Sequence, residues 1–286
     1  MDEQLLETGR AELRRHKDTY NLDFSIADLA PTLCALAGVP MPSSCCATPI
    51  ACVVDQASHL MGGVGKAEKL LVFCPDAIGE HQRELYPEQL ARVKRLAGFE
   101  IKSAGVMPSV TPVCFGSIFS GASPEVHGIK EYARPVLSVE TVFDTFPKAG
   151  RKACIISRDQ CSMDMIFRQR DVDYLAFGSD ERAFRATELA MEQGDYDLIV
   201  SYMMDYDESG HHHGPWAPES VAQLRLAVER FERLVQDTET HWKEYNRLVA
   251  FLPDHGQHPI DSQTGGHGAD IPDDMRVDHY YRVRGK

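Results

Sequence analysis

Six short apolar runs, spaced by longer stretches with helical periodicity, constrain the fold of this chain more than any other feature. The runs cover residues 69–75, 99–106, 152–157, 172–177, 196–203 and 247–253. Most of them are continuously apolar, which is typical of strands covered on both faces of a parallel sheet. The helical stretches among them are 87–98, 138–150, 180–194 and 218–246. This alternation predicts an α/β fold with a doubly wound, mostly parallel central sheet and helices on both of its faces.

The length and charge of the chain narrow its class and its partners. A chain of 286 residues is long enough for one large α/β domain with a sizeable core, and we expect a single domain over 1–286. The formal net charge is −13, which argues against a nucleic acid polymer as partner, because phosphate backbones require clustered Lys and Arg. A small phosphate substrate stays compatible with this charge, since a bound metal ion can supply positive charge locally.

Compartment and redox state follow from the N-terminus and the cysteines. The first 20 residues are of mixed charge and lack the apolar core of a secretion signal, and no apolar segment is long enough to span a bilayer. We therefore expect a cytoplasmic protein with no membrane partner. The eight cysteines are expected to be free thiols, and the cluster at 45–52 fits no zinc-binding spacing. Residues 61–69 are interpreted as a flexible joint, and their glycine spacing does not fit a phosphate-binding loop.

Asp, His and Thr residues follow most of the predicted strands. In open α/β sheets the chemistry gathers at the carboxyl ends of the strands, so these positions are candidate site residues. Any one of them alone is more often a helix cap or a turn residue. Several such residues on one predicted edge instead favour a site for zinc or a similar divalent ion. The residues at these positions are Asp76, Thr111, Asp205, Asp207, His211, Asp254, His255 and His267.

The stretch Asp205–Pro215, which reads DYDESGHHHGP, holds three carboxylates and three adjacent histidines. By itself it is either a solvated polar loop or half of a metal site.

Five motifs in the order PDAIG, MPSVTPVCFGSIFSGASPEVHGI, DYDESGHHHGP, LPDHGQ and GGHG resemble the alkaline phosphatase superfamily. The resemblance is strongest to the branch of type I phosphodiesterases and nucleotide pyrophosphatases, which is close to phosphonoacetate hydrolase. It covers residues 68–270, which we interpret as a metal-binding catalytic core.

The resemblance implies two metal ions and a ligand set. Zinc is expected, although Asp and His ligands also accept manganese or iron. It implies that one ion is bound by Asp76, Thr111, Asp254 and His255. It implies that the second ion is bound by Asp207, His211 and His267. His212 and His213 are then neighbours that could line the mouth of the site, and His127 and His258 are structural.

The activity that the resemblance implies is hydrolysis of small phosphate esters. The expected enzyme is a phosphodiesterase or nucleotide pyrophosphatase in which metal-activated Thr111 attacks phosphorus and forms a phospho-threonine intermediate. Phosphonoacetate hydrolase-like or phosphomonoesterase activity is the alternative within the superfamily. A degenerate metal-binding homologue without activity is the alternative outside it. Nothing in the sequence indicates the oligomeric state.

The sequence departs from the branch at two places. The branch commonly has an Asn three residues after the nucleophile, which donates to the phosphoryl group, and this chain has Cys114, whose thiol is a weak donor. Residues 25–42 resemble a segment that other members carry after the last His. The N-terminal segment 1–60 is therefore interpreted as the family's C-terminal helix moved by circular permutation; the alternative is an ordinary amphipathic helix with a Gly cap.

Overall fold

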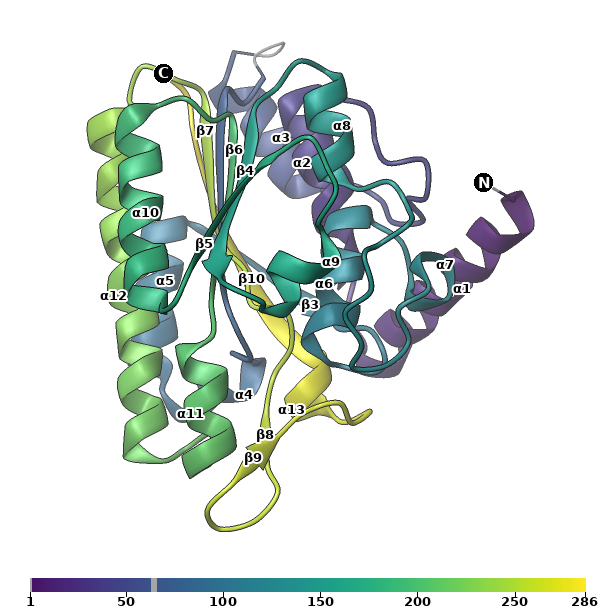
Figure 1. The fold of residues 1–286 in the computed structure, drawn as a ribbon, viewed down its shortest axis with the longest axis vertical. Helices are drawn as coiled ribbons and strands as arrows, with labels where there is room; N and C mark the ends of the chain where they lie inside the picture. Colours follow the sequence, from purple (N-terminus) through teal and green to yellow (C-terminus); the bar gives the residue numbers. More distant parts are fainter. Residues whose placement is uncertain (1, 63–65) are drawn as a thin grey trace.

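The computed structural model, which describes residues 2–62 and 66–286, contains one eight-stranded sheet between two layers of helices (Figure 1). The sheet runs in the order β1 (Phe24–Ser25), β3 (Phe99–Ala104), β10 (Arg276–Arg284), β7 (Arg247–Phe251), β2 (Lys69–Pro75), β6 (Leu198–Met203), β4 (Ala153–Arg158) and β5 (Asp173–Phe177). Strand β10 is antiparallel to both of its neighbours, and the other neighbouring pairs are parallel. The predicted fold class is therefore confirmed.

The helices divide into two layers, one on each face of the sheet (Figure 1). One layer holds α1 (Glu3–Tyr20), η1 (Ile26–Asp28), α2 (Leu29–Ala37), α3 (Ala51–Leu60), α6 (Thr111–Ser120), α7 (Pro124–His127), α8 (Val142–Lys148) and α9 (Ser162–Ile166). The other holds α5 (Pro87–Ala97), α10 (Asp180–Gln193) and α12 (Pro218–His241). Near the carboxyl ends of the parallel strands lie α4 (Glu80–Leu85), α11 (Asp205–His213), α13 (Pro272–Met275) and the hairpin of β8 (His258–Pro259) and β9 (Gly265–Gly266).

All six strands expected from the apolar runs are present, with ends shifted by a few residues at most. The structure adds β10, a central strand that the sequence does not reveal, because charged residues interrupt its apolar pattern. These charges are neutralised in place: Asp278 of β10 accepts a hydrogen bond of 2.6 Å from Arg83, and Arg282 donates to Glu239 at 2.8 Å. Residues 63–65 of the predicted joint lie outside the described residues.

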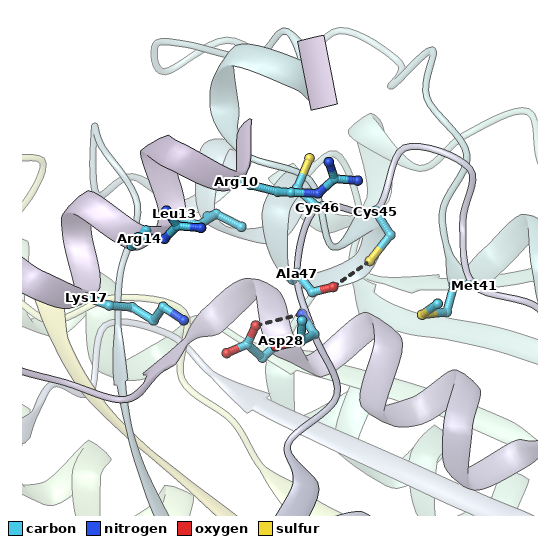
Figure 2. A pocket seen from close by; sticks show the side chains of 10 residues that line it. Arg10, Leu13, Arg14, Lys17, Asp28, Met41, Cys45, Cys46 and Ala47 are labelled. Carbon is cyan, nitrogen blue, oxygen red and sulfur yellow. Dashed lines mark hydrogen bonds between the residues drawn. The ribbon is translucent and has the colours of Figure 1, made fainter. Parts of the chain in front are cut away.

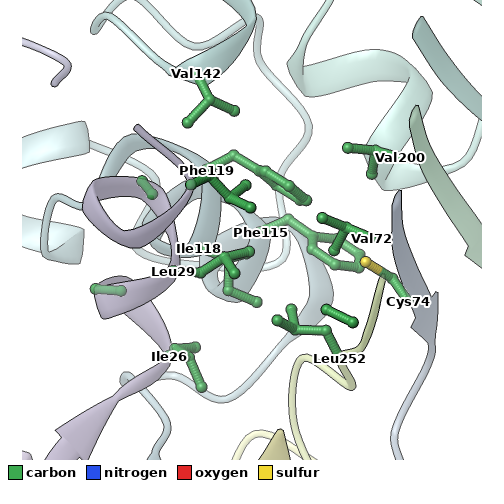
Figure 3. Packing of buried hydrophobic residues seen from close by; sticks show 14 of the residues in the cluster. Ile26, Leu29, Val72, Cys74, Phe115, Ile118, Phe119, Val142, Val200 and Leu252 are labelled. Carbon is green, nitrogen blue, oxygen red and sulfur yellow. The ribbon is translucent and has the colours of Figure 1, made fainter. Parts of the chain in front are cut away.

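Helix α6 is anchored by an aromatic face against the centre of the sheet. Phe115, Ile118 and Phe119 are fully buried, and they pack toward Val72 and Leu252 (Figure 3). Loss of a buried Phe side chain costs about 3–5 kcal/mol, so this packing strongly fixes the position of the helix. Because Thr111 is the first residue of α6, the same packing fixes the candidate nucleophile.

The N-terminal segment packs against the end of β3 and against α6. Strand β1 pairs with the end of β3, through Phe24 opposite Ser103, and η1 and α2 pack on α6. The segment is therefore close to the sheet edge that carries the site, and the changed chain order itself stays a prediction. Within the described residues, no helix combines the length and the apolar character needed to cross a membrane.

Candidate active site

The candidate site residues converge at the carboxyl edge of the sheet because they lie at or just beyond the ends of five different elements. Asp76 follows β2, Asp254 and His255 follow β7, and Thr111 begins α6. Asp207 and His211 lie on α11, which follows β6, and His267 comes directly after β9. The stretch 205–215 is thus mainly a helix and not a polar loop. Its i, i+4 spacing places Asp207 and His211 on one face.

One cluster consists of Asp76, Asp254 and His255, all of them fully buried or nearly so. His255 Nε2 lies 3.5 Å from Asp76 Oδ1 and 3.3 Å from Asp254 Oδ2. Thr111 Oγ1 lies 3.3 Å from the same nitrogen. The four residues that the resemblance assigns to one metal ion are therefore within reach of one common point.

The second cluster consists of Asp207, His211 and His267. Asp207 Oδ1 lies 3.3 Å from His211 Nε2 and 3.5 Å from His267 Nε2, and the two nitrogens are 3.2 Å apart. The rings of His255 and His267 stack with centroids 4.1 Å apart, so the two clusters are adjacent. All seven predicted residues thus lie in one site, and their roles as ligands stay a prediction.

Backbone carbonyls fix the tautomer of all three histidines. His211 Nδ1 donates to Gly265 O, His255 Nδ1 to Gly256 O and His267 Nδ1 to Ser109 O, each at 3.0 Å. In the neutral imidazole this leaves Nε2 as a lone pair that points into the site. Such a hydrogen bond to the second ring nitrogen is the usual support of a metal-binding His.

The donor atoms fit a pair of divalent cations. The Nε2 lone pair of His255 faces two buried carboxylate oxygens, Asp76 Oδ1 and Asp254 Oδ2, and neither has a hydrogen-bond partner among the described residues. Three electron-rich atoms this close repel one another unless positive charge lies between them. Three protein donors of the Asp/His type, with a further position left for substrate, are the ligand set of catalytic zinc.

The pKa values of these groups reflect the same excess of negative charge. Burial, and then the charge of Asp254, raises the pKa of Asp76 well above its usual value. Burial raises the pKa of Asp254 to about 7. The hydrogen bond to Asp207 raises the pKa of His211 to about 9, whereas burial, together with the neighbouring His255, lowers that of His267 to about 3. In the protein without metal, protons thus replace part of the charge that a cation would supply.

A cavity of about 540 Å³ opens over the two clusters. It is lined by Asp76, Thr111, Asp207, His211 and His267, so substrate can reach these residues. Asp254 and His255 lie beneath them, with no exposed surface. A volume of this size suits a small organic phosphate.

Four further residues belong to the site that the sequence did not indicate. Tyr202 lines the cavity and donates its hydroxyl to Asp76 Oδ2. Gln257 is fully buried and donates Nε2 to Asp207 Oδ1 at 3.1 Å. Ser162 and Glu208 line the cavity. Glu208 directly follows Asp207, and Gln257 lies two residues after His255. This closeness to predicted ligands is the one sequence feature that indicates these two residues.

Cys114 does not take the place of the Asn that it replaces. Its side chain is fully buried in the hydrophobic core under α6 and is not among the residues that line the cavity. Burial raises the pKa of its thiol well above the usual value. A phosphoryl donor, if one is needed, must therefore come from another residue.

The other histidines lie outside the clusters. His127 is buried beside Ser117, with its Nε2 3.1 Å from Ser117 Oγ, and His258 Nδ1 lies 2.7 Å from Asp274 Oδ1. These contacts agree with the structural roles expected for both. His212 and His213 are not among the cavity-lining residues within the described part of the chain, so the expectation that they line its mouth has no support.

A second cavity, of about 380 Å³, lies between α1, η1 and the loop 41–48 (Figure 2). Arg10, Arg14 and Lys17 of α1 line one side of it, and Asp28 lies on its floor. Asp28 is held by the backbone N–H groups of Ser25 and Thr48. None of the predicted site residues reaches this cavity.

Sequence comparisons match parts of the chain to one family and to two human proteins. Residues 157–284 match the family described as type I phosphodiesterase / nucleotide pyrophosphatase. Human GPI ethanolamine phosphate transferase 3, catalytic subunit, is 28% identical over 131 residues, which are 46% of this chain and 10% of that protein. The catalytic subunit of human GPI ethanolamine phosphate transferase 2 is 23% identical over 183 residues, 59% of this chain and 18% of its own length. The chain thus spans less than a fifth of the length of these relatives.

Solved structures share the fold over most of the chain. Murine ectonucleotide pyrophosphatase / phosphodiesterase 5 superposes with a TM-score of 0.57 at 14% identity, covering 76% of this chain and 88% of that one. Phosphonoacetate hydrolase from Sinorhizobium meliloti 1021, solved with phosphonoacetate, gives a TM-score of 0.51 at 17% identity over 70% of this chain and 60% of that one. The C-terminal periplasmic domain of EcEptC from Escherichia coli, a complex with Zn, gives a TM-score of 0.50 at 15% identity. The match covers 75% of this chain and 72% of that one. The resemblance seen in the motifs is therefore confirmed for part of the chain: residues 157–284 match the type I phosphodiesterase / nucleotide pyrophosphatase family, and the fold is shared with these solved structures.

Proposed function

We propose that this protein hydrolyses phosphate esters, with Thr111 as the nucleophile beside two divalent metal ions, and that the ions are zinc. The observation that carries the proposal is the convergence of Thr111 Oγ1 with two Asp/His clusters whose free Nε2 lone pairs face carboxylate oxygens. Asp76, Asp254, His255 and Thr111 would hold one ion. Asp207, His211 and His267 would hold the other. When bound, the ions lower the pKa of a coordinated hydroxyl and neutralise charge on the phosphoryl oxygens.

The residues of the chain define the course of the reaction. Thr111 Oγ attacks phosphorus, the bond from phosphorus to the ester oxygen breaks, and the released alcohol takes up a proton. Water then cleaves the phospho-threonine ester, which restores the Thr111 hydroxyl and releases the phosphoryl product. Thr111 is the first residue of α6, where the positive end of the helix dipole favours a phosphoryl anion. Tyr202 and Gln257 hold the carboxylates of Asp76 and Asp207 in position.

The proposal is tested by the hydrolysis of bis-(p-nitrophenyl) phosphate beside p-nitrophenyl phosphate. Wild type loaded with zinc is compared with Thr111→Ala, which lacks the nucleophile, and with Thr111→Ser, which keeps a hydroxyl. We expect diester turnover by wild type, loss by at least about 10³-fold in Thr111→Ala, and partial activity in Thr111→Ser.

The same measurement separates the alternatives. Preference for the monoester would identify a phosphatase. Failure with both esters but turnover of phosphonoacetate would identify a phosphonate hydrolase. Because the chain is similar to ethanolamine phosphate transferases, the group that accepts the phosphoryl unit could be an alcohol instead of water. Turnover that requires an added alcohol would identify a transferase. Two bound zinc ions with no turnover of any of these compounds would contradict the proposed activity and favour a non-catalytic homologue.

A further inference from the structure

We propose that the cavity selects phosphodiesters whose alcohol groups are neutral or cationic, and that it disfavours substrates with phosphate groups beyond the scissile one. This inference rests on the proposed function and narrows it to the diesterase side of the family. The basis is the charge of the residues that line the cavity apart from the predicted ligands. These residues are Val110, Tyr132, Ser162, Tyr202, Met204, Glu208, Ile260 and Gly266.

Within the described residues, no Lys or Arg side chain lines this cavity. A nucleoside polyphosphate carries further negative charges on the leaving side of the scissile bond. Proteins bind such groups with Arg, Lys or additional metal ions, because a desolvated phosphate without a cation is costly. Two metal ions at the scissile phosphoryl group would already be engaged there. A second phosphate would therefore find no cationic partner in the wall.

Apart from the predicted ligands, Glu208 is the one charged residue among the described residues that line the cavity, and its charge is negative. It lies on α11 next to Asp207, and 43% of its side chain is exposed. Its Oε2 accepts a hydrogen bond of 2.6 Å from Arg158 Nη1. Arg158 itself is not among the residues that line the cavity, so this pair presents its carboxylate, and not its guanidinium, to the cavity. The guanidinium of Arg158 is thus paired with Glu208, and the side chain of this pair that lines the cavity is acidic.

The remaining wall suits an organic group without negative charge. Tyr132 and Ile260 are exposed by 62% and 66%, although both are large apolar side chains that border the cavity. Val110 and Met204 continue this apolar lining. The Tyr132 ring and the Glu208 carboxylate line the same cavity, and such groups favour cationic alcohols through cation–π and charge attraction.

The test uses two substrates with the same nucleoside. Thymidine 5′-monophosphate p-nitrophenyl ester and thymidine 5′-triphosphate both release thymidine monophosphate on attack at the α-phosphorus, but the triphosphate carries additional charges. We expect kcat/KM of the zinc-loaded wild type to favour the ester by at least about tenfold, the effect of one poorly screened charge. In Glu208→Ala, which frees Arg158, the ratio of kcat/KM for the ester to kcat/KM for the triphosphate should fall by about tenfold. In the double variant Glu208→Ala/Arg158→Ala this ratio should rise again.

Glu232→Ala is the matched control, because Glu232 pairs with Arg92 between α12 and α5, neither residue lines the cavity, and the ratio should stay unchanged. Equal kcat/KM for both substrates in wild type would overturn the inference, as would a ratio that Glu208→Ala does not move. Bis-(p-nitrophenyl) phosphate, which has no second phosphate, is assayed in parallel. If bis-(p-nitrophenyl) phosphate is hydrolysed but the two thymidine substrates have equal kcat/KM, only the inference on selectivity is overturned. If bis-(p-nitrophenyl) phosphate is not hydrolysed, the proposed function is overturned as well.

Discussion

At the scale of single residues, the site depends on side chains that hold the predicted ligands as much as on the ligands. Gln257 is the clearest case, since its amide donates to Asp207 Oδ1 at 3.1 Å and to the Asp207 carbonyl at 3.4 Å. The packing around it is tight: a Cβ on Gly210 would lie 1.7 Å from Gln257 Oε1. The orientation of Asp207 is therefore set by this amide as well as by its own helix.

Gln257→Met, which keeps the size of the side chain and removes the donor, should weaken zinc binding at the Asp207 cluster. Loss of a group that supports a metal ligand typically costs 10–100-fold in affinity, and we expect about that. The measurement is competition with a chromophoric chelator, and Gln263→Met on an exposed loop is the control. Equal affinity of Gln257→Met and wild type would show that Gln257 does not position Asp207.

Ser162 is the best-placed donor to take over from the Asn that Cys114 replaces. Its side chain is buried at the start of α9 and borders the same cavity as Thr111, whereas the Cys114 thiol lies in the core. Ser162→Ala should lower kcat for bis-(p-nitrophenyl) phosphate by about 10²-fold, as loss of an oxyanion donor does. An unchanged kcat would exclude the Ser162 hydroxyl from phosphoryl stabilisation.

The difference between the residues that the sequence predicted and those that it did not has a physical reason. Asp207, His211, Asp254 and His255 stand in motifs with fixed spacing beside strand ends, so local sequence shows them. Ser162 contributes through space from an unrelated element, and no local pattern distinguishes it from an ordinary Ser at a helix start. Through-space partners of this kind become visible only when the fold is known.

At the scale of elements, the turn after β7 is the most constrained segment of the site. Gly256 passes so close to α13 that an added Cβ would lie 1.8 Å from the Asp273 carbonyl oxygen, with the backbone of Gly79 at 3.1 Å. Its N–H donates to Asp274 O at 2.9 Å. This contact fixes the path of the chain directly after Asp254 and His255.

Gly256→Ala should lower the free energy of unfolding by at least about 2 kcal/mol, because backbone atoms on both sides cannot move away cheaply. Gly178→Ala is the matched control, since no atom lies within 4 Å of the position of its Cβ, and its stability should stay within about 0.5 kcal/mol of wild type. Urea denaturation of the two variants and wild type measures the difference. If both variants are equally stable, the close approach at Gly256 does not constrain the turn.

Strands could be predicted from the sequence where every residue is buried, because the sequence then shows a continuous apolar run. Strands β2, β6 and β7 are buried at every position, and their continuous apolar runs show it. Strand β10 lies among them but carries Arg276, Asp278 and Arg282, whose charges are paired with residues from other elements. A pattern read along one strand cannot reveal a charge that is neutralised from a neighbouring helix.

At the scale of the whole molecule, buried His127 should make a contribution to the pH dependence of stability that disfavours the folded state in mild acid. It lies beneath α6, accepts a hydrogen bond from Ile129 N at its Nδ1, and burial lowers its pKa to about 4. In the unfolded chain a His titrates near pH 6.5, so between about pH 6.5 and 4 the unfolded state binds a proton that the folded state does not. The free energy of unfolding therefore falls as the pH falls, by up to about 1.4 kcal/mol per pH unit from this residue.

His127→Gln should flatten this dependence, even if its stability at pH 7 is lower. The measurement is the free energy of unfolding between pH 7 and 4.5 for wild type, His127→Gln and the exposed-site control His241→Gln. Equal slopes for wild type and His127→Gln would contradict a neutral buried His127.

The architecture of the molecule explains why the fold and the position of the site were predictable and the substrate was not. Parallel strands bring their carboxyl ends to one edge of the sheet. Asp76 after β2 and Asp254 after β7 therefore meet, although they lie far apart in the chain. The charge of the cavity depends instead on which side chain of the pair Arg158–Glu208 faces inward. The three-dimensional packing decides which of these two side chains faces the cavity, and the local sequence does not show it.

The central claim, a covalent phospho-threonine formed by Thr111, is tested most directly by the stereochemical course at phosphorus. A phosphorothioate diester of known configuration is hydrolysed in ¹⁸O-labelled water by the zinc-loaded enzyme, and the configuration of the labelled product is determined. Two successive in-line displacements, first by Thr111 and then by water, predict overall retention of configuration. Inversion would show that water attacks phosphorus directly, and would contradict Thr111 as the nucleophile.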